Sequence, residues 1–142
     1  VTGNVGRSAK NRKIMDVFPD GNQGKHAVTH WKMLKRLRYV SLIQCNLETG
    51  RTHQIRAHMK YLGHPLFNDA TYGGDKIRKG TQFSKYKTFV HNAFELLPRQ
   101  ALHAMSLGFI HPVTKEKLYF EAPLPEDFQE GLDKWENYVN FE

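Results

Sequence analysis

The sequence has 142 residues, enough for one domain with a substantial core and too few for two independent domains. Its 21 lysines and arginines outnumber 14 aspartates and glutamates, and the formal net charge of +7 favours an anionic partner such as nucleic acid. No apolar run approaches the roughly 20 residues needed to span a bilayer, which argues against a membrane protein. The single cysteine, Cys45, cannot form an internal disulfide, so a reducing, cytoplasmic setting is expected.

The charge is distributed unevenly along the chain. Basic residues cluster in residues 7–13, 32–38 and 76–87, whereas residues 126–142 are acidic. This distribution predicts a basic working face and a neutral or acidic back. The opening stretch is polar and starts with Val1, so no secretion signal is expected and the chain looks like part of a longer protein.

Strand patterns dominate the first third of the chain. Residues 13–18 alternate loosely and are followed by the turn residues Pro19, Asp20 and Gly21, which predicts a hairpin with the next run. That run, residues 27–37, fits both helical and strand spacing. A strand is favoured because residues 38–47 form a clear strand after only a brief break. We expect these three strands to form an antiparallel sheet edge.

A short amphipathic helix is predicted from near Arg51 to Gly63, which is a helix stop signal. Three apolar residues recur at i, i+4 and i+7 and should form its buried stripe: Ile55, Met59 and Leu62. Three basic side chains would share the other side: His53, Arg56 and Lys60. Such a cationic face, directed away from the core, is the kind of surface that binds an anion.

The second half of the chain adds two helices and a hairpin. Residues 75–87 form a lysine-rich loop that is either a solvated surface or a substrate contact. A helix is predicted to follow and to end at Pro98, then a hairpin over residues 102–123, then a helix from Pro125. The last helix has an apolar stripe: Phe128, Leu132, Trp135 and Val139. The predicted fold is one α+β domain, with a mainly antiparallel sheet and helices packed on one side.

Arg56 is the first candidate for chemistry, because a guanidinium offers a rigid fork of donors that fits a carboxylate or a phosphate. Its neighbours on the short helix also carry hydrogen-bonding groups: Arg51, His53, Gln54 and His58. The alternative is that Arg56 is only a surface charge. The density of polar groups favours a functional site, in which His53 orients Arg56 or contacts a phosphate.

A metal site is not expected, although the chain has eight histidines. His26 and His30 have the i, i+4 spacing that binds zinc on a helix, but in a strand their imidazoles stand too far apart. The chain has no HExxH motif, no serine nucleophile elbow and no glycine-rich phosphate loop.

Three segments together resemble the RluA-type RNA pseudouridine synthases. LETGRTHQIRAHMKYLGHPLFNDATYGG is similar to the C-terminal signature of that family, LHAMSLGFIHPVTKEKLYFEAPLPEDF to the strand pair that closes its domain, and GKHAVTHWKML to the strand before the signature. They cover nearly the whole chain and stand in the family's order.

The resemblance implies an enzyme that isomerises uridine to pseudouridine in ribosomal or transfer RNA, without a metal or cofactor. In such enzymes the target nucleotide is flipped out and an aspartate acts at the sugar. The family's signature arginine corresponds to Arg56, which is expected to pair with that aspartate and keep it ionised. Ile55 corresponds to an apolar position of the signature near the target base. We also predict substrate contacts from four polar residues: Arg51, His53, Gln54 and Lys60.

The sequence also departs from the family. The segment that carries the catalytic aspartate in the family, similar to HRLDxxTSG, has no counterpart here, and none of the six aspartates stands in that context: Asp16, Asp20, Asp69, Asp75, Asp127 and Asp133. Asp69 lies inside the signature, but its position before a turn suggests capping or loop closure. We therefore predict that residues 1–142 are the C-terminal part of the catalytic domain, inactive alone and prone to self-association through exposed apolar surface. The alternative is a stand-alone RNA-binding module without catalysis.

Overall fold

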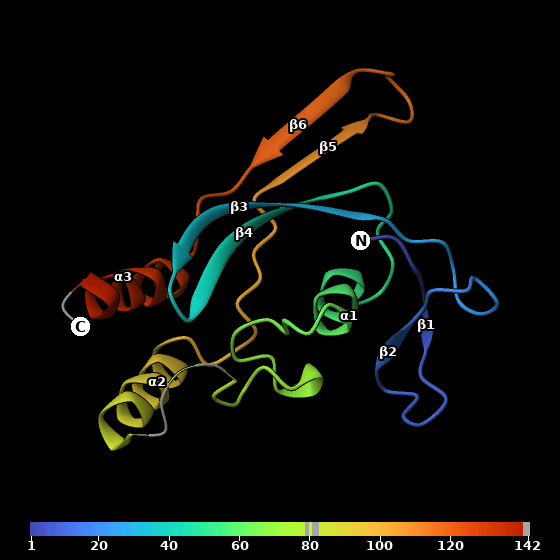
Figure 1. The fold of residues 1–142 in the computed structure, drawn as a ribbon. Helices are drawn as coiled ribbons and strands as arrows, with labels where there is room; N and C mark the ends of the chain where they lie inside the picture. Colours follow the sequence, from blue (N-terminus) through green and yellow to red (C-terminus); the bar gives the residue numbers. More distant parts are fainter. Residues whose placement is uncertain (79, 81–82, 141–142) are drawn as a thin grey trace.

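The computed structural model describes residues 1–78, 80 and 83–140 and contains both helices and antiparallel strand pairs (Figure 1). The strands are β1 (Asn4–Arg7), β2 (Met15–Phe18), β3 (Thr29–Leu37), β4 (Val40–Leu47), β5 (Ser106–Ile110) and β6 (Lys117–Glu121). The helices are α1 (Gln54–Tyr61), the single 3₁₀ turn η1 (Ala70–Tyr72), α2 (Ser84–Leu96) and α3 (Glu126–Asn140). The α+β class is confirmed. Within the described ranges, no helix is long and apolar enough to cross a bilayer.

The strands form three separate two-stranded sheets, β1–β2, β3–β4 and β5–β6. The predicted three-strand edge is therefore wrong, because β2 pairs with the preceding strand instead of the following one. Its Val17 lies opposite Val5 of β1, and the other edge of β1 is occupied by Lys25, whose backbone exchanges two 2.9 Å hydrogen bonds with that of Val5. This approach requires glycine, since a Cβ on Gly6 would lie 2.7 Å from the Cα atom of Gly24.

The strand interpretation of residues 27–37 is confirmed, since β3 pairs with β4 along its whole length apart from a bulge between Met33 and Lys35. Thr29 and Leu37, at the two ends of β3, are buried, whereas the residues between them are exposed. The turn to β4 places Arg38 in the left-handed region at φ 62°.

Helices α2 and α3 lie side by side and share an aromatic core with the turn between β3 and β4 (Figure 1). The centre of this core is Trp135 of α3, whose ring packs edge-on against Phe89 of α2 at a centroid distance of 4.8 Å. α2 begins at Ser84, inside the segment predicted as a loop, because Tyr86 is buried against the same core. The prediction of a long lysine-rich loop is therefore wrong from residue 84 onward, and residues 79, 81 and 82 of that segment lie outside the described residues.

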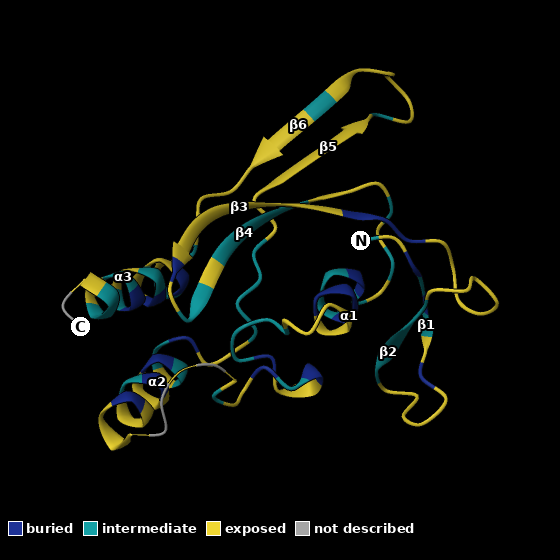
Figure 2. Cartoon of the chain, in the orientation of Figure 1, coloured by how far each residue is buried: buried dark blue, intermediate teal, exposed yellow. Residues whose placement is uncertain are grey.

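The predicted β5–β6 hairpin is confirmed, and it is exposed along most of its length (Figure 2). Its apolar residues Leu107, Ile110 and Tyr119 are each more than half exposed. A separate set of buried residues includes Ala57 and Met59 of α1, Val5 of β1 and Val28 just before β3. This second group holds the helix that carries the predicted site.

Candidate active site

Helix α1 is bounded by two residues in left-handed backbone conformations. His53 precedes its first residue at φ 52°, and Gly63 follows its last turn at φ 88°. The backbone nitrogen of Gly63 donates to the Lys60 carbonyl and that of His64 to the Met59 carbonyl, the paired bonds of a Schellman motif. The predicted stop at Gly63 is confirmed, whereas the helix begins three residues after Arg51.

The buried face of α1 differs from the predicted stripe. Its buried residues are Gln54, Ala57, His58 and Met59, while Ile55 is half-buried and Leu62 is 41% exposed. Only Met59 of the predicted stripe is buried, because the helix turns polar groups towards β3, where hydrogen-bonding partners are present.

The segment after α1 returns towards it and is closed at Asp69. The Asp69 carbonyl accepts hydrogen bonds from the backbone nitrogens of Tyr72 and Gly74, so the predicted loop closure is confirmed for the backbone. The Asn68 side chain donates to the carbonyls of Phe94 and Leu97 at the end of α2. These bonds fix the position from which Asp69 reaches α1.

The Asp69 side chain forms a two-pronged ion pair with Arg56. The Nε atom of Arg56 donates to Oδ2 at 2.9 Å and its Nη2 atom donates to Oδ1 at 2.8 Å. The pair is largely buried, with side-chain exposures of 12% for Arg56 and 1% for Asp69. The hydrogen bond with Asp69 raises the pKa of the guanidinium, although burial acts in the opposite direction. The predicted side-chain cap is absent at η1, because the carboxylate is directed to Arg56.

Tyr72 joins the three basic residues predicted to share one side of α1. The guanidinium carbon of Arg56 lies 4.9 Å from the centre of the Tyr72 ring, and the Lys60 ammonium lies 5.9 Å from it. The Tyr72 hydroxyl lies 2.8 Å from Nδ1 of His53 and accepts a hydrogen bond from the backbone nitrogen of Met15. The predicted shared side is confirmed, but the expectation that it is directed away from the core is wrong for Arg56, whose side chain is largely buried against Asp69 and Tyr72.

The environment of His53 favours the neutral imidazole. Desolvation lowers its pKa, and the nearby positive charge of Arg56 lowers it further, while Asp69 acts in the opposite direction. A neutral His53 can accept a hydrogen bond from the Tyr72 hydroxyl at Nδ1 and keep its Nε2–H for another partner.

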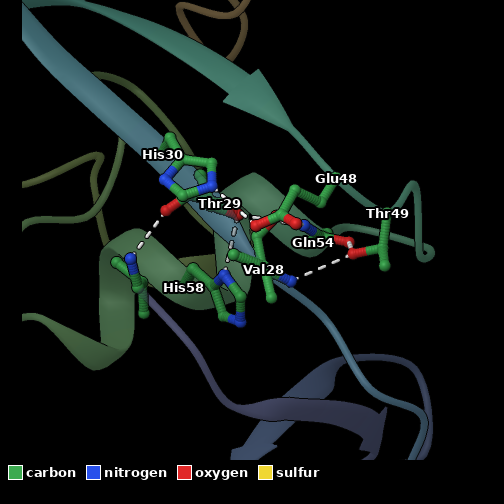
Figure 3. Close-up of polar contacts among 8 residues, drawn as sticks. Val28, Thr29, His30, Glu48, Thr49, Gln54 and His58 are labelled. Atoms are coloured by element: carbon green, nitrogen blue, oxygen red, sulfur yellow. Dashed lines mark hydrogen bonds and ion pairs between the residues drawn. The ribbon is translucent and has the colours of Figure 1, made fainter.

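Gln54 is a structural residue in this arrangement (Figure 3). Its amide nitrogen donates to the Val28 carbonyl and to the Thr29 hydroxyl, each at 3.0 Å, and its oxygen accepts from the Thr49 hydroxyl and the Arg51 backbone nitrogen. Both donors and both lone pairs are thus used, and the residue is buried. Gln54 therefore joins α1 to β3, and its substrate contact stays a prediction.

His58 completes the same network, since its Nδ1 lies 2.8 Å from the Thr29 hydroxyl (Figure 3). Its Nε2 lies 2.9 Å from the Gly3 carbonyl oxygen, which can only accept, so Nε2 carries the proton. Burial lowers the pKa of His58, while the Gly3 hydrogen bond acts in the opposite direction. His58 therefore fastens α1 to the N-terminal segment and faces away from solvent.

A cleft of about 440 Å³ lies beside the start of α1. Its described lining combines the predicted site residues with apolar and amide groups: Leu47, Arg51, His53, Gln54, Ile55, Arg56, Gln100 and Leu102. Arg51 is fixed by a 2.8 Å bond from its Nε to the His26 carbonyl. Of the six predicted residues, only Lys60 is outside this lining. The described lining residues include no carboxylate, and no group of three or more metal-ligating side chains occurs in the described ranges.

Two residues of the site were not predicted from the sequence. The sequence pattern indicates only a capping or loop-closing role for Asp69 and no role for Tyr72. Their one signal is their place inside the signature segment, a few residues beyond Gly63.

Comparisons with known proteins identify the family of the chain. A family model described as RNA pseudouridylate synthase matches residues 9–61, which include β2, β3, β4 and α1. An uncharacterized RNA pseudouridine synthase of Chlorobaculum parvum is 52% identical over 132 residues, 92% of this chain and 40% of that protein. A ribosomal large subunit pseudouridine synthase D of Zymomonas mobilis is 45% identical over 125 residues, 88% of this chain and 36% of that protein. The chain therefore belongs to the RNA pseudouridine synthase family, as the sequence resemblance predicted.

A solved structure supports the fold. Human RNA pseudouridylate synthase domain containing 1 superposes with a TM-score of 0.61 at 29% identity, over 88% of this chain and 47% of that chain. The sequence described here thus spans about 40% of the length of the curated relatives it matches and about half of this human structure.

Proposed function

We infer that this chain forms one side of the active site of an enzyme that isomerises uridine to pseudouridine in RNA. The observation that carries the proposal is the cleft beside α1, which is lined by the largely buried Arg56 and by the apolar residues Ile55 and Leu102. A flipped base needs apolar walls and a few fixed polar groups, and this lining offers both. Ribosomal RNA is the proposed substrate, because several relatives are named as ribosomal large subunit enzymes.

Arg56 is proposed to hold the catalytic aspartate. Asp69 occupies the Nε and Nη2 positions of the guanidinium, and Nη1 has no hydrogen-bond partner among the described residues. The Nη1 side can therefore receive a second carboxylate at the cleft. A guanidinium within hydrogen-bonding distance lowers the pKa of that carboxylate and keeps it ionised, as is required of a group that acts at the sugar.

The remaining predicted residues have proposed contacts with RNA. Arg51 and His53 line the cleft and can donate to a phosphate or a sugar hydroxyl, while Ile55 packs against the base. Lys60 is exposed above Tyr72 and is proposed to neutralise a flanking phosphate. No such contact is proposed for Gln54, because its amide is fully used within the fold.

The chain by itself is proposed to be inactive, since the described lining of the cleft lacks a carboxylate and Asp69 is held by Arg56. The test is tritium release from RNA labelled at C5 of uridine, comparing this 142-residue chain with the full-length encoded protein. We expect release from the full-length protein alone. Release by the chain would contradict the proposed inactivity. Salt-dependent RNA binding without release from either would favour the RNA-binding module.

Arg56→Lys in the full-length protein tests the role of Arg56. Arg56→Ala is unsuitable, because leaving the Asp69 charge buried and unpaired costs about 3–5 kcal/mol of stability. A lysine keeps the positive charge but cannot present a fork to two carboxylates. We expect folded protein with turnover reduced by about 100-fold or more. Arg99→Lys, at an exposed ion pair with Asp127, is the matched control, and wild-type turnover by Arg56→Lys would remove Arg56 from the mechanism.

Self-association of the chain is also proposed, through the exposed apolar residues of the β5–β6 hairpin. Sedimentation velocity over a concentration series should show a mass that rises with concentration. Replacing Leu107 and Ile110 by serine should reduce this rise, and an unchanged monomer at all concentrations would contradict the idea.

A further inference from the structure

Asp69 is a buried carboxylate for which the proposed reaction has so far no use. It is 1% exposed, it is absent from the described lining of the cleft, and both of its oxygens accept from Arg56. Burying a charge at this position is unfavourable unless the charge is paired. The presence of a carboxylate at position 69 therefore needs an explanation other than solubility at the surface.

The ion pair restricts Arg56 in two ways. Two parallel hydrogen bonds to one carboxylate fix the direction of the guanidinium, and its Nη1 end has no hydrogen-bond partner among the described residues. The Tyr72 ring, 4.9 Å from the guanidinium carbon, fixes the position of the guanidinium from another side. Rotation of the Arg56 side chain would break both contacts.

The position of Asp69 is itself fixed from behind. Its backbone nitrogen donates to the Leu66 carbonyl at 3.1 Å, and its carbonyl accepts from Gly74 at 2.7 Å. The neighbouring Asn68 is tied to the end of α2. The carboxylate therefore stands at the end of a loop fixed by hydrogen bonds, and Asp69 is not among the described residues that line the cleft.

We propose that Asp69 is a positioning residue, which aims the Nη1 end of Arg56 into the cleft. This proposal rests on the proposed function, because it assigns Asp69 a role only if Arg56 acts in catalysis. The rival explanation is that the pair merely fastens the loop of residues 64–74 to α1. The two explanations predict different effects of an Asp69 substitution on the rate of tritium release in a protein that already carries Arg56→Lys.

The test uses Asp69→Asn in the full-length encoded protein. Asparagine has nearly the same shape, but it offers Arg56 one acceptor oxygen and no charge. Single-turnover tritium release with excess enzyme should slow by about 10- to 100-fold, the scale on which misplacing a catalytic group by about 1 Å acts. The dissociation constant for RNA should change less than about twofold, because Asp69 does not touch the substrate. Asp127→Asn, at the exposed pair with Arg99, is the matched control and should keep the wild-type rate.

Combining Asp69→Asn with Arg56→Lys separates positioning from fastening. If Asp69 acts through the guanidinium, its substitution should change the rate less than about twofold once lysine occupies position 56. An equal loss in both backgrounds would overturn the proposal in favour of fastening, as would a wild-type rate in Asp69→Asn alone. If Arg56→Lys itself turns over at the wild-type rate, the proposed role of Arg56 fails and the positioning role fails with it.

Nuclear magnetic resonance of the arginine side chains gives a readout besides activity. In the wild-type protein the Nε–H of Arg56 should exchange slowly with solvent, because it is buried and bonded to Asp69. Asp69→Asn should accelerate this exchange by about 10-fold or more, the factor that corresponds to about 1.4 kcal/mol. Unchanged protection would mean that Arg56 keeps its orientation without Asp69, which would overturn the proposal.

Discussion

The hydroxyl oxygen of Tyr72 lies 2.8 Å from the Nδ1 atom of His53, so a residue of η1 is bonded to the residue that immediately precedes α1. The same hydroxyl accepts the backbone N–H of Met15 in β2. One buried oxygen thus joins three segments that are distant in the sequence. These bonds hold the start of α1, the helix that carries Arg56, to β2 and to η1.

Tyr72→Phe is predicted to destabilise the protein by about 1–3 kcal/mol, because the Met15 N–H and His53 lose their buried partner. The ring and its contact with Arg56 remain, so the activity per folded molecule should fall by a much smaller factor than the equilibrium constant for folding. Urea unfolding measures the change. Tyr119→Phe is the control, since it removes an exposed hydroxyl bonded to Glu121 and should change stability by less than about 0.5 kcal/mol. Equal losses from both variants would contradict the central role of the Tyr72 hydroxyl.

Periodicity and stop signals were sufficient to predict most elements. β3 and β4 follow from alternation and a short break, α1 ends at Gly63, and α2 ends before Pro98. The pairing of β1 with β2 was not predictable in this way, because it depends on the close approach of Gly6 and Gly24, which only the folded path of the chain brings together.

The site was predicted in part for a similar reason. Arg56 was identified by its chemistry and its place in the signature, and a carboxylate was expected as its partner. Its partner among the described residues, Asp69, lies 13 positions further on, across a loop whose course is set by bonds to α2. The burial of Gln54 was not predictable, because a polar residue on a helix is usually exposed, whereas here Val28 and Thr29 accept from its amide nitrogen and Thr49 and Arg51 donate to its oxygen.

Gln54→Glu is predicted to destabilise the protein by about 2–4 kcal/mol, since it removes two buried donors and sets an anionic acceptor against the Val28 carbonyl. The thermal midpoint should fall markedly, while the RNA affinity of the remaining folded protein should change little. Gln23→Glu, in an exposed loop, makes the same chemical change and should be nearly neutral. A stable Gln54→Glu protein with weakened RNA binding would instead support the predicted substrate contact.

The stability of the protein should depend on pH through His58. Burial lowers its folded pKa below the ordinary value of about 6.5, so between these two values the unfolded chain binds more protons than the folded one. The free energy of unfolding therefore rises with pH across this window. Its contribution is fully present above about pH 6.5 and is lost as the pH falls through the folded pKa.

His58→Gln tests this dependence by urea unfolding between about pH 5 and about pH 7.5. The variant should be less stable at neutral pH, because Thr29 and Gly3 lose their bonds to the imidazole, and its slope with pH should be smaller than in the wild type. Some slope should remain, since the pKa of His53 is lowered in the same direction. His91→Gln, on the exposed face of α2, controls for the loss of a histidine as such. An unchanged slope in His58→Gln would mean that His58 is not the group that titrates.

Two glycines of the signature segment should respond very differently to alanine. A Cβ on Gly74 would lie 1.8 Å from the Leu66 carbonyl oxygen and 3.0 Å from the Asp69 nitrogen, both backbone atoms of the loop that presents Asp69. A Cβ on Gly50 would have no atom within 4 Å. Gly74→Ala is therefore predicted to cost about 1–3 kcal/mol or more, because the loop must move, whereas Gly50→Ala should be neutral within about 0.5 kcal/mol.

The consequence of Gly74→Ala for the site follows from the same clash. Displacement of Leu66 and Asp69 would shift the carboxylate that holds Arg56, so tritium release by the folded part of the full-length variant should also slow. Unfolding curves and single-turnover rates of the two alanine variants, measured side by side, separate the two effects. Wild-type stability and rate in Gly74→Ala would show that the loop adapts without moving Asp69, and the close packing between residues 66 and 74 would then have no part in holding Arg56.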